Sequence, residues 1–166
     1  MWGRNDVAFI PAACRLYNIA ATVTVLQFDD KLLMAIPLLA CMVAAAAFYH
    51  LPPRVLPSIQ AVEGGWIGAV HRNADGSDDL GVMQVNARWI EKLSRVTALP
   101  QDVVRARLIG DGCFNIAAAA AIMRTYLNEA HGDLMKAIGY YHSHTPALSL
   151  DYDEKVLRSA ATLFGR

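Results

Sequence analysis

Residues 61–86 read AVEGGWIGAVHRNADGSDDLGVMQVN, and this stretch decides between an all-helical fold and a mixed one. Apolar residues before it recur at helical spacing from residue 51 to residue 62, and Gly64–Gly65 ends that helix. Residues 67–85 lose this periodicity and carry Asn, Asp, Gly and Ser, which predicts a long loop or an irregular β-hairpin. Because helical patterns return after this insertion, we expect an α+β fold that is mostly helix.

Helices are predicted over most of the chain that follows. Asn86, Asp133 and Asp151 are placed to cap helices, because their side chains accept hydrogen bonds from the first backbone N–H groups. Thr145–Pro146 is expected to stop a helix, since a proline in a helix interior removes a backbone donor. The five predicted helices cover residues 86–93, 100–108, 115–127, 133–141 and 151–163.

A charge-free apolar run, LLMAIPLLACMVAAAAFY, covers residues 32–49 and contributes most of the positive mean hydropathy of +0.28. Lys31 precedes the run and residues 44–47 are all alanine, a pattern typical of the cleavage region of a secretory signal peptide. We therefore expect an export segment that is cleaved near Ala46 or Ala47, or one that stays uncleaved as a membrane anchor.

The position of this run predicts the domain organisation. Residues 1–48 form an N-terminal extension with the signal peptide or anchor, and residues 49–166 form one domain. About thirty mixed residues precede the apolar run, which is unusual for a signal peptide, so translation is expected to start at Met34. The predicted location is the periplasm, either in solution or at the inner membrane.

The three cysteines are Cys14, Cys41 and Cys113. A chain cleaved near residue 47 retains Cys113 alone, so no intrachain disulfide is expected in the mature protein.

Neither charge nor ligand spacing indicates a nucleic acid, a metal or a cofactor. Fifteen basic side chains balance fifteen acidic ones, so no basic surface for nucleic acid is predicted. His142 and His144 form an HxH pair, yet no third ligand stands at a diagnostic spacing. Asp75, Asp78 and Asp79 do not meet the spacing of an EF-hand loop.

Glu63 is the candidate catalytic residue, because it ends a helix where the dipole disfavours a carboxylate. It lies four residues after Ile59 and seven after Leu56, on the face that those side chains turn toward the core. Burial and the helix end both raise a carboxyl pKa, which suits a general acid near neutral pH. The alternative is a surface glutamate at a frayed helix end.

Two further groups allow a functional and a structural interpretation. The amides of Gln84 and Asn86 can bind sugar hydroxyl or acetamido groups, or they can simply belong to a turn before a helix. The aspartates between residues 75 and 79 can supply the second carboxylate of a two-acid glycosidase, or they can be solvated turn residues.

Four motifs occur in the order and spacing of one known family. They are AVEGGW (61–66), NADGSDDLGVMQVN (73–86), CFNI (113–116) and AIGYYHSHTP (137–146). In this respect the chain resembles lytic transglycosylases with the soluble-lytic-transglycosylase (SLT) domain, over nearly all of residues 51–160. It is most similar to the small members that serve type III and type IV secretion and conjugation. The resemblance implies a goose-type, lysozyme-like helical domain.

The resemblance also implies an activity and a set of site residues. The expected reaction cleaves the β-1,4 bond between N-acetylmuramic acid and N-acetylglucosamine in peptidoglycan and leaves a 1,6-anhydromuramic end, without a cofactor. Glu63 matches the single catalytic acid and base. Residues that match substrate-binding positions are Met83, Gln84, Asn86, Tyr141 and His142. The implied partners are peptidoglycan glycan strands and components of an envelope-spanning secretion or conjugation complex, for a protein that acts as a monomer.

Three departures from the family pattern keep alternatives open. Gly64 replaces the usual serine, and His142 and His144 replace an asparagine and a glycine. Cys113, which often has a disulfide partner in the next helix of related enzymes, has none there. A lysozyme-type hydrolase and a noncatalytic wall-binding assembly factor are therefore the alternative functions.

Overall fold

The computed structural model describes residue 36 and residues 38–165, and it confirms an α+β fold that is mostly helix. The helices are α4 (Leu39–Phe48), α5 (Val55–Glu63), the 3-10 helix η4 (Ala87–Trp89), α6 (Ile90–Thr97), α7 (Gln101–Gly110), α8 (Gly112–Glu129), α9 (Leu134–His142) and α10 (Pro146–Phe164). The strands are β1 (Val70–Arg72), β2 (Asp78–Leu80) and β3 (Val85–Asn86).

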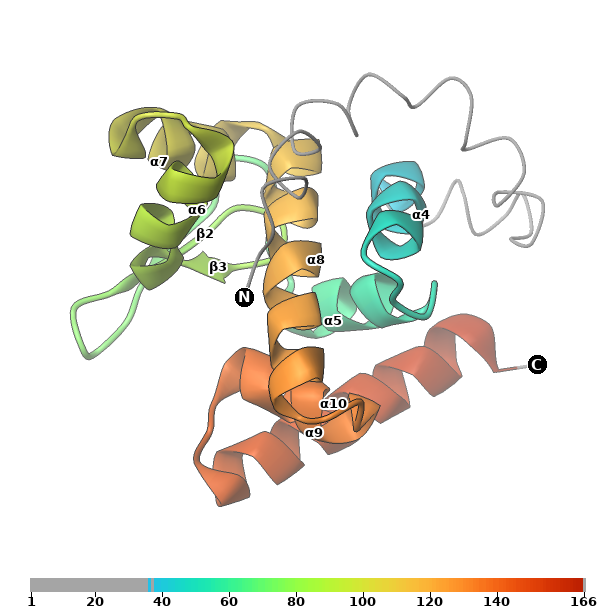
Figure 1. Ribbon diagram of the computed structural model, residues 1–166. Helices are drawn as coiled ribbons and strands as arrows, with labels where there is room; N and C mark the ends of the chain where they lie inside the picture. Colours follow the sequence, from blue (N-terminus) through green and yellow to red (C-terminus); the bar gives the residue numbers. More distant parts are fainter. Residues whose placement is uncertain (1–35, 37, 166) are drawn as a thin grey trace.

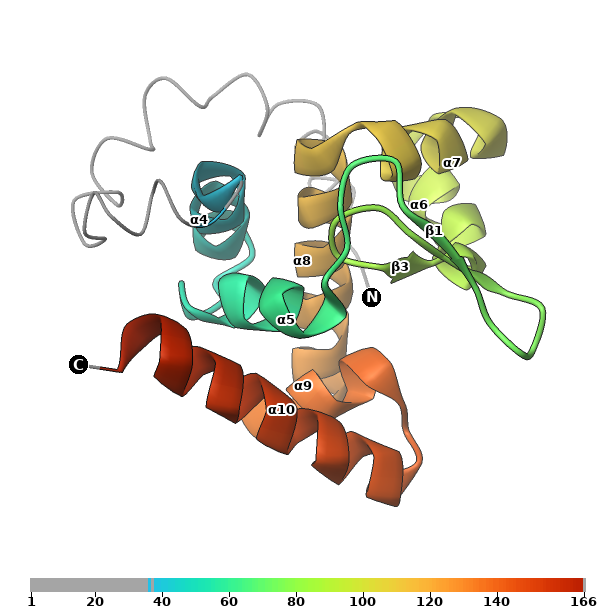
Figure 2. The ribbon, with the colours of Figure 1, turned by 180° about the vertical axis from the view of Figure 1, so that it is seen from behind.

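Helix α8 runs through the middle of the molecule (Figure 1). Helices α4 and α5 lie on one side of it, while α6, α7 and the sheet lie on the other (Figure 1). Residues 117–121 of α8 are five consecutive alanines, each at most 1% exposed, so neighbouring helices can approach this helix closely. Helix α10 packs against both α9 and α5 and covers one end of the domain (Figure 2).

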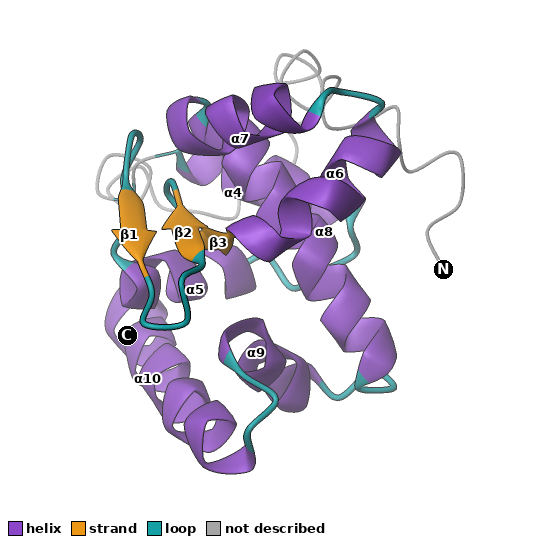
Figure 3. Ribbon diagram, turned by 90° about the vertical axis from the view of Figure 1, so that its left-hand side faces the viewer, coloured by secondary structure: helices purple, strands orange, loops and turns teal. Residues whose placement is uncertain are grey.

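The insertion after α5 is a three-stranded antiparallel sheet in the order β1-β2-β3 (Figure 3). Leu80 is the central residue of its register, since it pairs with Val70 on one side and with Val85 on the other. The side chains of Leu80 and Val85 are buried, whereas β1 is exposed along its whole length. The predicted irregular hairpin is therefore confirmed, and its inner edge rests on the helical core.

Three predicted helix starts are wrong. The helix predicted from residue 51 begins at Val55. Helix α8 begins at Gly112, with Asp111 accepting a hydrogen bond from the backbone N–H of Phe114. Helix α10 begins at Pro146, because a proline in the first turn gives up only a donor that has no partner in the helix. Asp151, which was expected to cap the last helix, lies inside it.

The segment predicted for export contributes a helix to the domain core. Leu39, Met42 and Val43 of α4 are at most 2% exposed, and the helix packs against α5 and α8. Cys41 of α4 forms a disulfide with Cys113 at the start of α8, with the two Cα atoms 5.4 Å apart. The expectation that Cys113 has no intrachain partner is therefore wrong for this chain. The boundary predicted at residues 48/49 falls within the packed structure, because α4 shares its core.

No single helix in the described part of the chain is both long and apolar enough to span a membrane. Within residues 38–165, helices α7 and α8 reach that length and composition when they are taken together, across a bend of 108°. The proposed start at Met34 and the first residues of the apolar run lie outside the described residues.

Candidate active site

Glu63 is the last residue of α5, as its sequence pattern predicts. Leu56 and Ile59 on the same face are fully buried, and Pro57 lies in the first turn, where it costs no hydrogen bond. The hydroxyl of Tyr152, from α10, donates a hydrogen bond of 2.5 Å to Glu63 Oε1. Within the described residues no other hydrogen bond to this carboxyl group is seen, and Glu63 lines a groove.

The surroundings of Glu63 raise its pKa from 4.5 to about 7, and burial is the largest cause. The hydrogen bond from Tyr152 lowers the pKa of Glu63, while the negative charge of Asp79 raises it. A carboxyl group with this pKa is partly protonated at neutral pH, so it can donate a proton and later accept one.

Two glycines fix where Glu63 points. Gly64 ends α5 in the left-handed conformation, with φ 63°, which a serine adopts only at a cost of about 1 kcal/mol. Gly65 lies so close to the hairpin that an added Cβ would stand 2.3 Å from the carbonyl oxygen of Gly81. The end of α5 is thereby held against the loop that carries Gln84.

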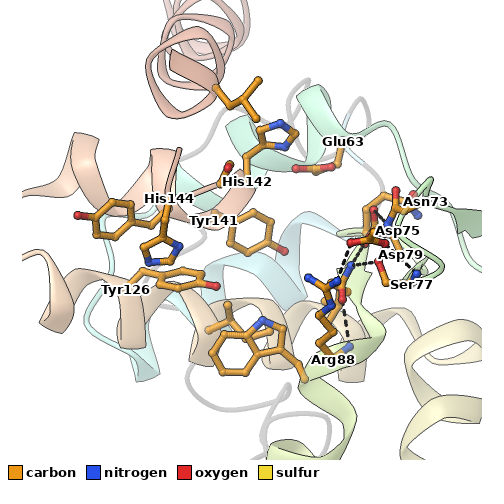
Figure 4. A pocket seen from close by; sticks show the side chains of 18 of the residues that line it. Glu63, Asn73, Asp75, Ser77, Asp79, Arg88, Tyr126, Tyr141, His142 and His144 are labelled. Atoms are coloured by element: carbon orange, nitrogen blue, oxygen red, sulfur yellow. Dashed lines mark hydrogen bonds and ion pairs between the residues drawn. The ribbon is translucent and has the colours of Figure 1, made fainter. Parts of the chain in front are cut away.

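Glu63 opens onto a groove of about 620 Å³ between the hairpin and the α9–α10 region (Figure 4). One wall is polar and comes from the hairpin, and the opposite wall is largely aromatic. The polar wall includes Asn73, Asp75, Ser77, Asp79, Gln84, Asn86 and Arg88; the other includes Trp89, Tyr126, Tyr140, Tyr141, His142 and His144. A groove with one apolar wall and one hydrogen-bonding wall suits a carbohydrate, whose rings have apolar faces and polar edges.

Three carboxyl groups line the groove, and Asp79 is the one whose charge acts on Glu63. Both of its oxygens accept hydrogen bonds. Asn86 donates to its Oδ1 at 2.8 Å, and Asn73 donates to its Oδ2 at 2.8 Å. Both amides also donate to the hydroxyl of Ser77. The Asn86 side chain therefore holds the polar wall together, in addition to capping η4 through the backbone N–H of Arg88.

The residues that the sequence predicts for the site differ in how deeply they are buried. Gln84 lines the groove and has φ 48°, an uncommon backbone conformation for a residue with a side chain. Met83 is fully buried, so its side chain lies under the floor and has no surface with which to touch a ligand. Tyr141 lines the groove, and its hydroxyl donates to the carbonyl oxygen of Met83 at 2.9 Å.

The two histidines that replace family residues have separate aromatic partners. The ring of His142 stacks on Tyr152, with centroids 4.9 Å apart and planes within 4°. The ring of His144 stacks on Tyr140, and its Nε2 lies 2.9 Å from Glu129 Oε1. Among the described residues no group of three His, Cys, Asp or Glu side chains is arranged to hold a metal.

Two residues that matter to the site were not among the residues predicted for it. Tyr152 is separated from Glu63 by 89 positions, and no local motif connects them. Asn115 belongs to the CFNI motif (113–116) and was expected to precede a helix, but it is fully buried within α8. Its amide donates to the carbonyl oxygens of Leu80 and Leu108 and accepts from the N–H of Met83. A buried asparagine with three backbone partners fixes the hairpin on the core.

Comparisons with known proteins agree with this geometry. The family model of the transglycosylase SLT domain matches residues 40–149, which includes α4. The invasion proteins IagB of Salmonella typhimurium and Salmonella typhi are each 26% identical over 106 residues. This similarity covers 63% of the chain and 62% of each relative's length. With the acid, the groove and the lysozyme-like fold in place, the chain belongs to the transglycosylase SLT domain family.

Proposed function

We propose that this protein is a lytic transglycosylase that cleaves the N-acetylmuramic acid–N-acetylglucosamine β-1,4 bond and forms a 1,6-anhydromuramic end. Its domain family indicates lytic-transglycosylase-type action on peptidoglycan. The observation that carries the specific reaction is Glu63, a single carboxyl group with a pKa of about 7 beside a groove. This pKa lets one residue act as acid and then as base.

The proposed reaction uses Glu63 twice. Protonated Glu63 donates its proton to the glycosidic oxygen, and the bond from that oxygen to C1 of the muramic residue breaks. The C6 hydroxyl oxygen of the same sugar then bonds to C1 and gives its proton to the Glu63 carboxylate, which restores the acid. Tyr152 stabilises the carboxylate between the two steps, because its hydroxyl donates to Oε1.

Asp79 is the feature that favours the alternative, a lysozyme-type hydrolase. It lines the same groove, and its charge acts on Glu63. A hydrolase needs a carboxylate that orients a water on the other face of the sugar. Both Asp79 oxygens already accept hydrogen bonds from Asn73 and Asn86, which supports a structural role and hence the transglycosylase reaction.

Digestion of purified peptidoglycan, followed by mass analysis of the released muropeptides, tests the proposal. We expect anhydro products that lack the elements of one water molecule relative to hydrolysis products. Reducing-end products in their place would identify a hydrolase. Wild-type protein that binds the wall and releases nothing would instead support a noncatalytic assembly factor.

Tyr152→Phe is expected to shift the pH profile of the reaction. Its hydroxyl lowers the pKa of Glu63, so its loss raises that pKa further above the ordinary value. The alkaline limb, where the acid loses its proton, should then move to higher pH. The maximal rate should fall about tenfold, because the carboxylate loses a hydrogen bond of the charged type. Rates of muropeptide release from pH 4 to 10 measure both effects; an unchanged alkaline limb would contradict the assigned contact.

We also propose that the protein acts as a monomer in the periplasm, for an envelope-spanning secretion or conjugation complex. The disulfide between Cys41 and Cys113 supports an oxidising compartment outside the cytoplasm. The names of the two relatives, which are invasion proteins, support an association with such machines.

A further inference from the structure

A second, smaller cavity of about 200 Å³ adjoins Glu63. It shares Glu63 and Gln84 with the main groove, so both residues border the two spaces. The remainder of its lining comes from the chain that leaves α5, namely Gly64, Gly65, Trp66, Ala69, Val70 and His71. Glu63 therefore stands where a larger and a smaller binding space meet.

Trp66 is the large side chain of this cavity, and it is 69% exposed. Its backbone is held in place, because its carbonyl oxygen accepts a hydrogen bond from Ala69, and Gly68 donates to Ile109. Burying a large apolar side chain contributes about 1.5–3 kcal/mol of favourable free energy. An exposed indole on a fixed backbone therefore offers a large apolar surface to a ligand.

The position of Glu63 determines what the smaller cavity has to hold. A glycosidic bond that Glu63 protonates must lie beside it, with sugars on both sides of that bond. The main groove accommodates the sugars on one side of the scissile bond. Because Glu63 and Gln84 line both spaces, the smaller cavity lies on the other side of that bond. Gly64 lines the smaller cavity beside Glu63, and the space around its Cα is open, since a Cβ there would meet no atom within 4 Å.

We propose that this cavity binds one sugar ring of the glycan strand, across the scissile bond from the sugars in the main groove, with Trp66 as its stacking platform. The assignment rests on the proposed function. A volume of about 200 Å³ is below the roughly 300–1,000 Å³ typical of sites for larger ligands, which limits the occupant to one ring. The apolar C–H face of the ring packs on the indole. Gln84 borders the polar edge, with its amide nitrogen held by a hydrogen bond of 2.8 Å to the carbonyl oxygen of Gly81.

A protein partner is the competing occupant, because Ile67 and Val70 are also exposed, at 53% and 49%. A protein docked on this surface would contact all three exposed apolar residues, Trp66, Ile67 and Val70, including Ile67, which does not line the cavity. A sugar subsite uses Trp66 and leaves Ile67 out, since Ile67 does not line the cavity. The continuity of this cavity with Glu63 favours the sugar.

The experiment measures binding of N-acetylglucosamine oligomers of two to six units by calorimetry, in a Glu63→Gln background that prevents turnover. Affinity should rise with length until both spaces are filled. Adding Trp66→Ala should remove the gain from the last unit and weaken the longest oligomer about tenfold, as expected for a lost aromatic contact. Trp66→Phe should restore part of it. Ile67→Ala is the matched control and should bind like the parent.

Two failures can be told apart. If Trp66→Ala and Ile67→Ala bind all oligomers with the affinity of the parent, the subsite is overturned while the proposed function stands. If the parent binds no oligomer and wild-type protein releases no muropeptides, the proposed function fails and the subsite with it. Thermal unfolding checks that the variants keep the fold, which we expect because both side chains are exposed.

Discussion

Glu63→Gln is expected to lower the rate of muropeptide release by a factor of about 10³ or more, because general acid and base catalysis by one residue is lost at both steps. Glutamine has almost the same shape, so it still fits beside Tyr152 and still accepts its hydrogen bond. It has no proton to donate to a glycosidic oxygen. Binding of glycan should therefore survive while turnover does not.

Glu91→Gln is the matched control for this variant. Glu91 lies on α6, is 67% exposed and pairs with Arg95, outside the groove. Its loss should leave the rate within twofold of wild type, since an exposed pair contributes little to stability. Comparable losses in both variants would show that the effect of Glu63→Gln is not specific to the groove.

A second readout of Glu63→Gln is the stability of the protein as a function of pH. The folded state holds the Glu63 proton more tightly than the unfolded chain, because its pKa is about 7 instead of 4.5. The stability gained is fully present below pH 4.5 and is lost as the pH rises through about 7. Denaturant unfolding of wild type should show a loss of up to about 3 kcal/mol from this group across that window, and the variant should not.

Cys41→Ala is expected to lower the free energy of unfolding by about 4 kcal/mol under oxidising conditions, near the upper end for a disulfide. The bond joins residues that are 72 positions apart, so the loop it closes is long. Without the disulfide, the folded protein keeps the apolar contacts of α4. The unfolded chain gains conformational freedom, which lowers the free energy of unfolding. Denaturant titrations of the purified protein, with and without a reducing agent, measure the difference.

Cys113→Ala should match Cys41→Ala, and the double variant should be no less stable than either single one, because each change breaks the same bond. A reducing agent should destabilise wild type to the level of the variants and leave the variants unchanged. Wild-type protein with titratable thiols at both positions and full stability would contradict the pairing. The protein purified from its native host should also still contain Cys41, which mass spectrometry of the purified chain checks.

Local signals in the sequence were sufficient to place Glu63. The spacing of Leu56, Ile59 and Glu63 predicted that the acid faces the core, and the structure confirms this placement. The change from helical periodicity to polar turn residues predicted the hairpin. The raised pKa of Glu63 was also predicted, from burial and from its position at a helix end. Burial is its largest cause, and the helix end is not one of its causes.

The remaining features depend on contacts between distant segments. Tyr152 reaches Glu63 only because α10 packs across α5, which no local pattern encodes. Helix α4 resembles an export segment because a buried helix and a signal peptide share the same composition. Its packing on α8 and the bond from Cys41 to Cys113 are tertiary contacts, so the local pattern does not predict them.

The backbone of Met83 connects parts of the domain that come from different regions of the chain. Asn115 of α8 accepts from its N–H, and Tyr141 of α9 donates to its carbonyl oxygen. One peptide unit on each side of a single residue is thus tied to two separate helices, immediately before Gln84. Wall residues that make no bond to Met83, such as Asn73 and Trp89, can therefore vary without moving this floor. Loss of either bond removes one of the two contacts that hold the segment before Gln84, so we expect variation in this domain to be tolerated in the walls sooner than at Asn115 or Tyr141.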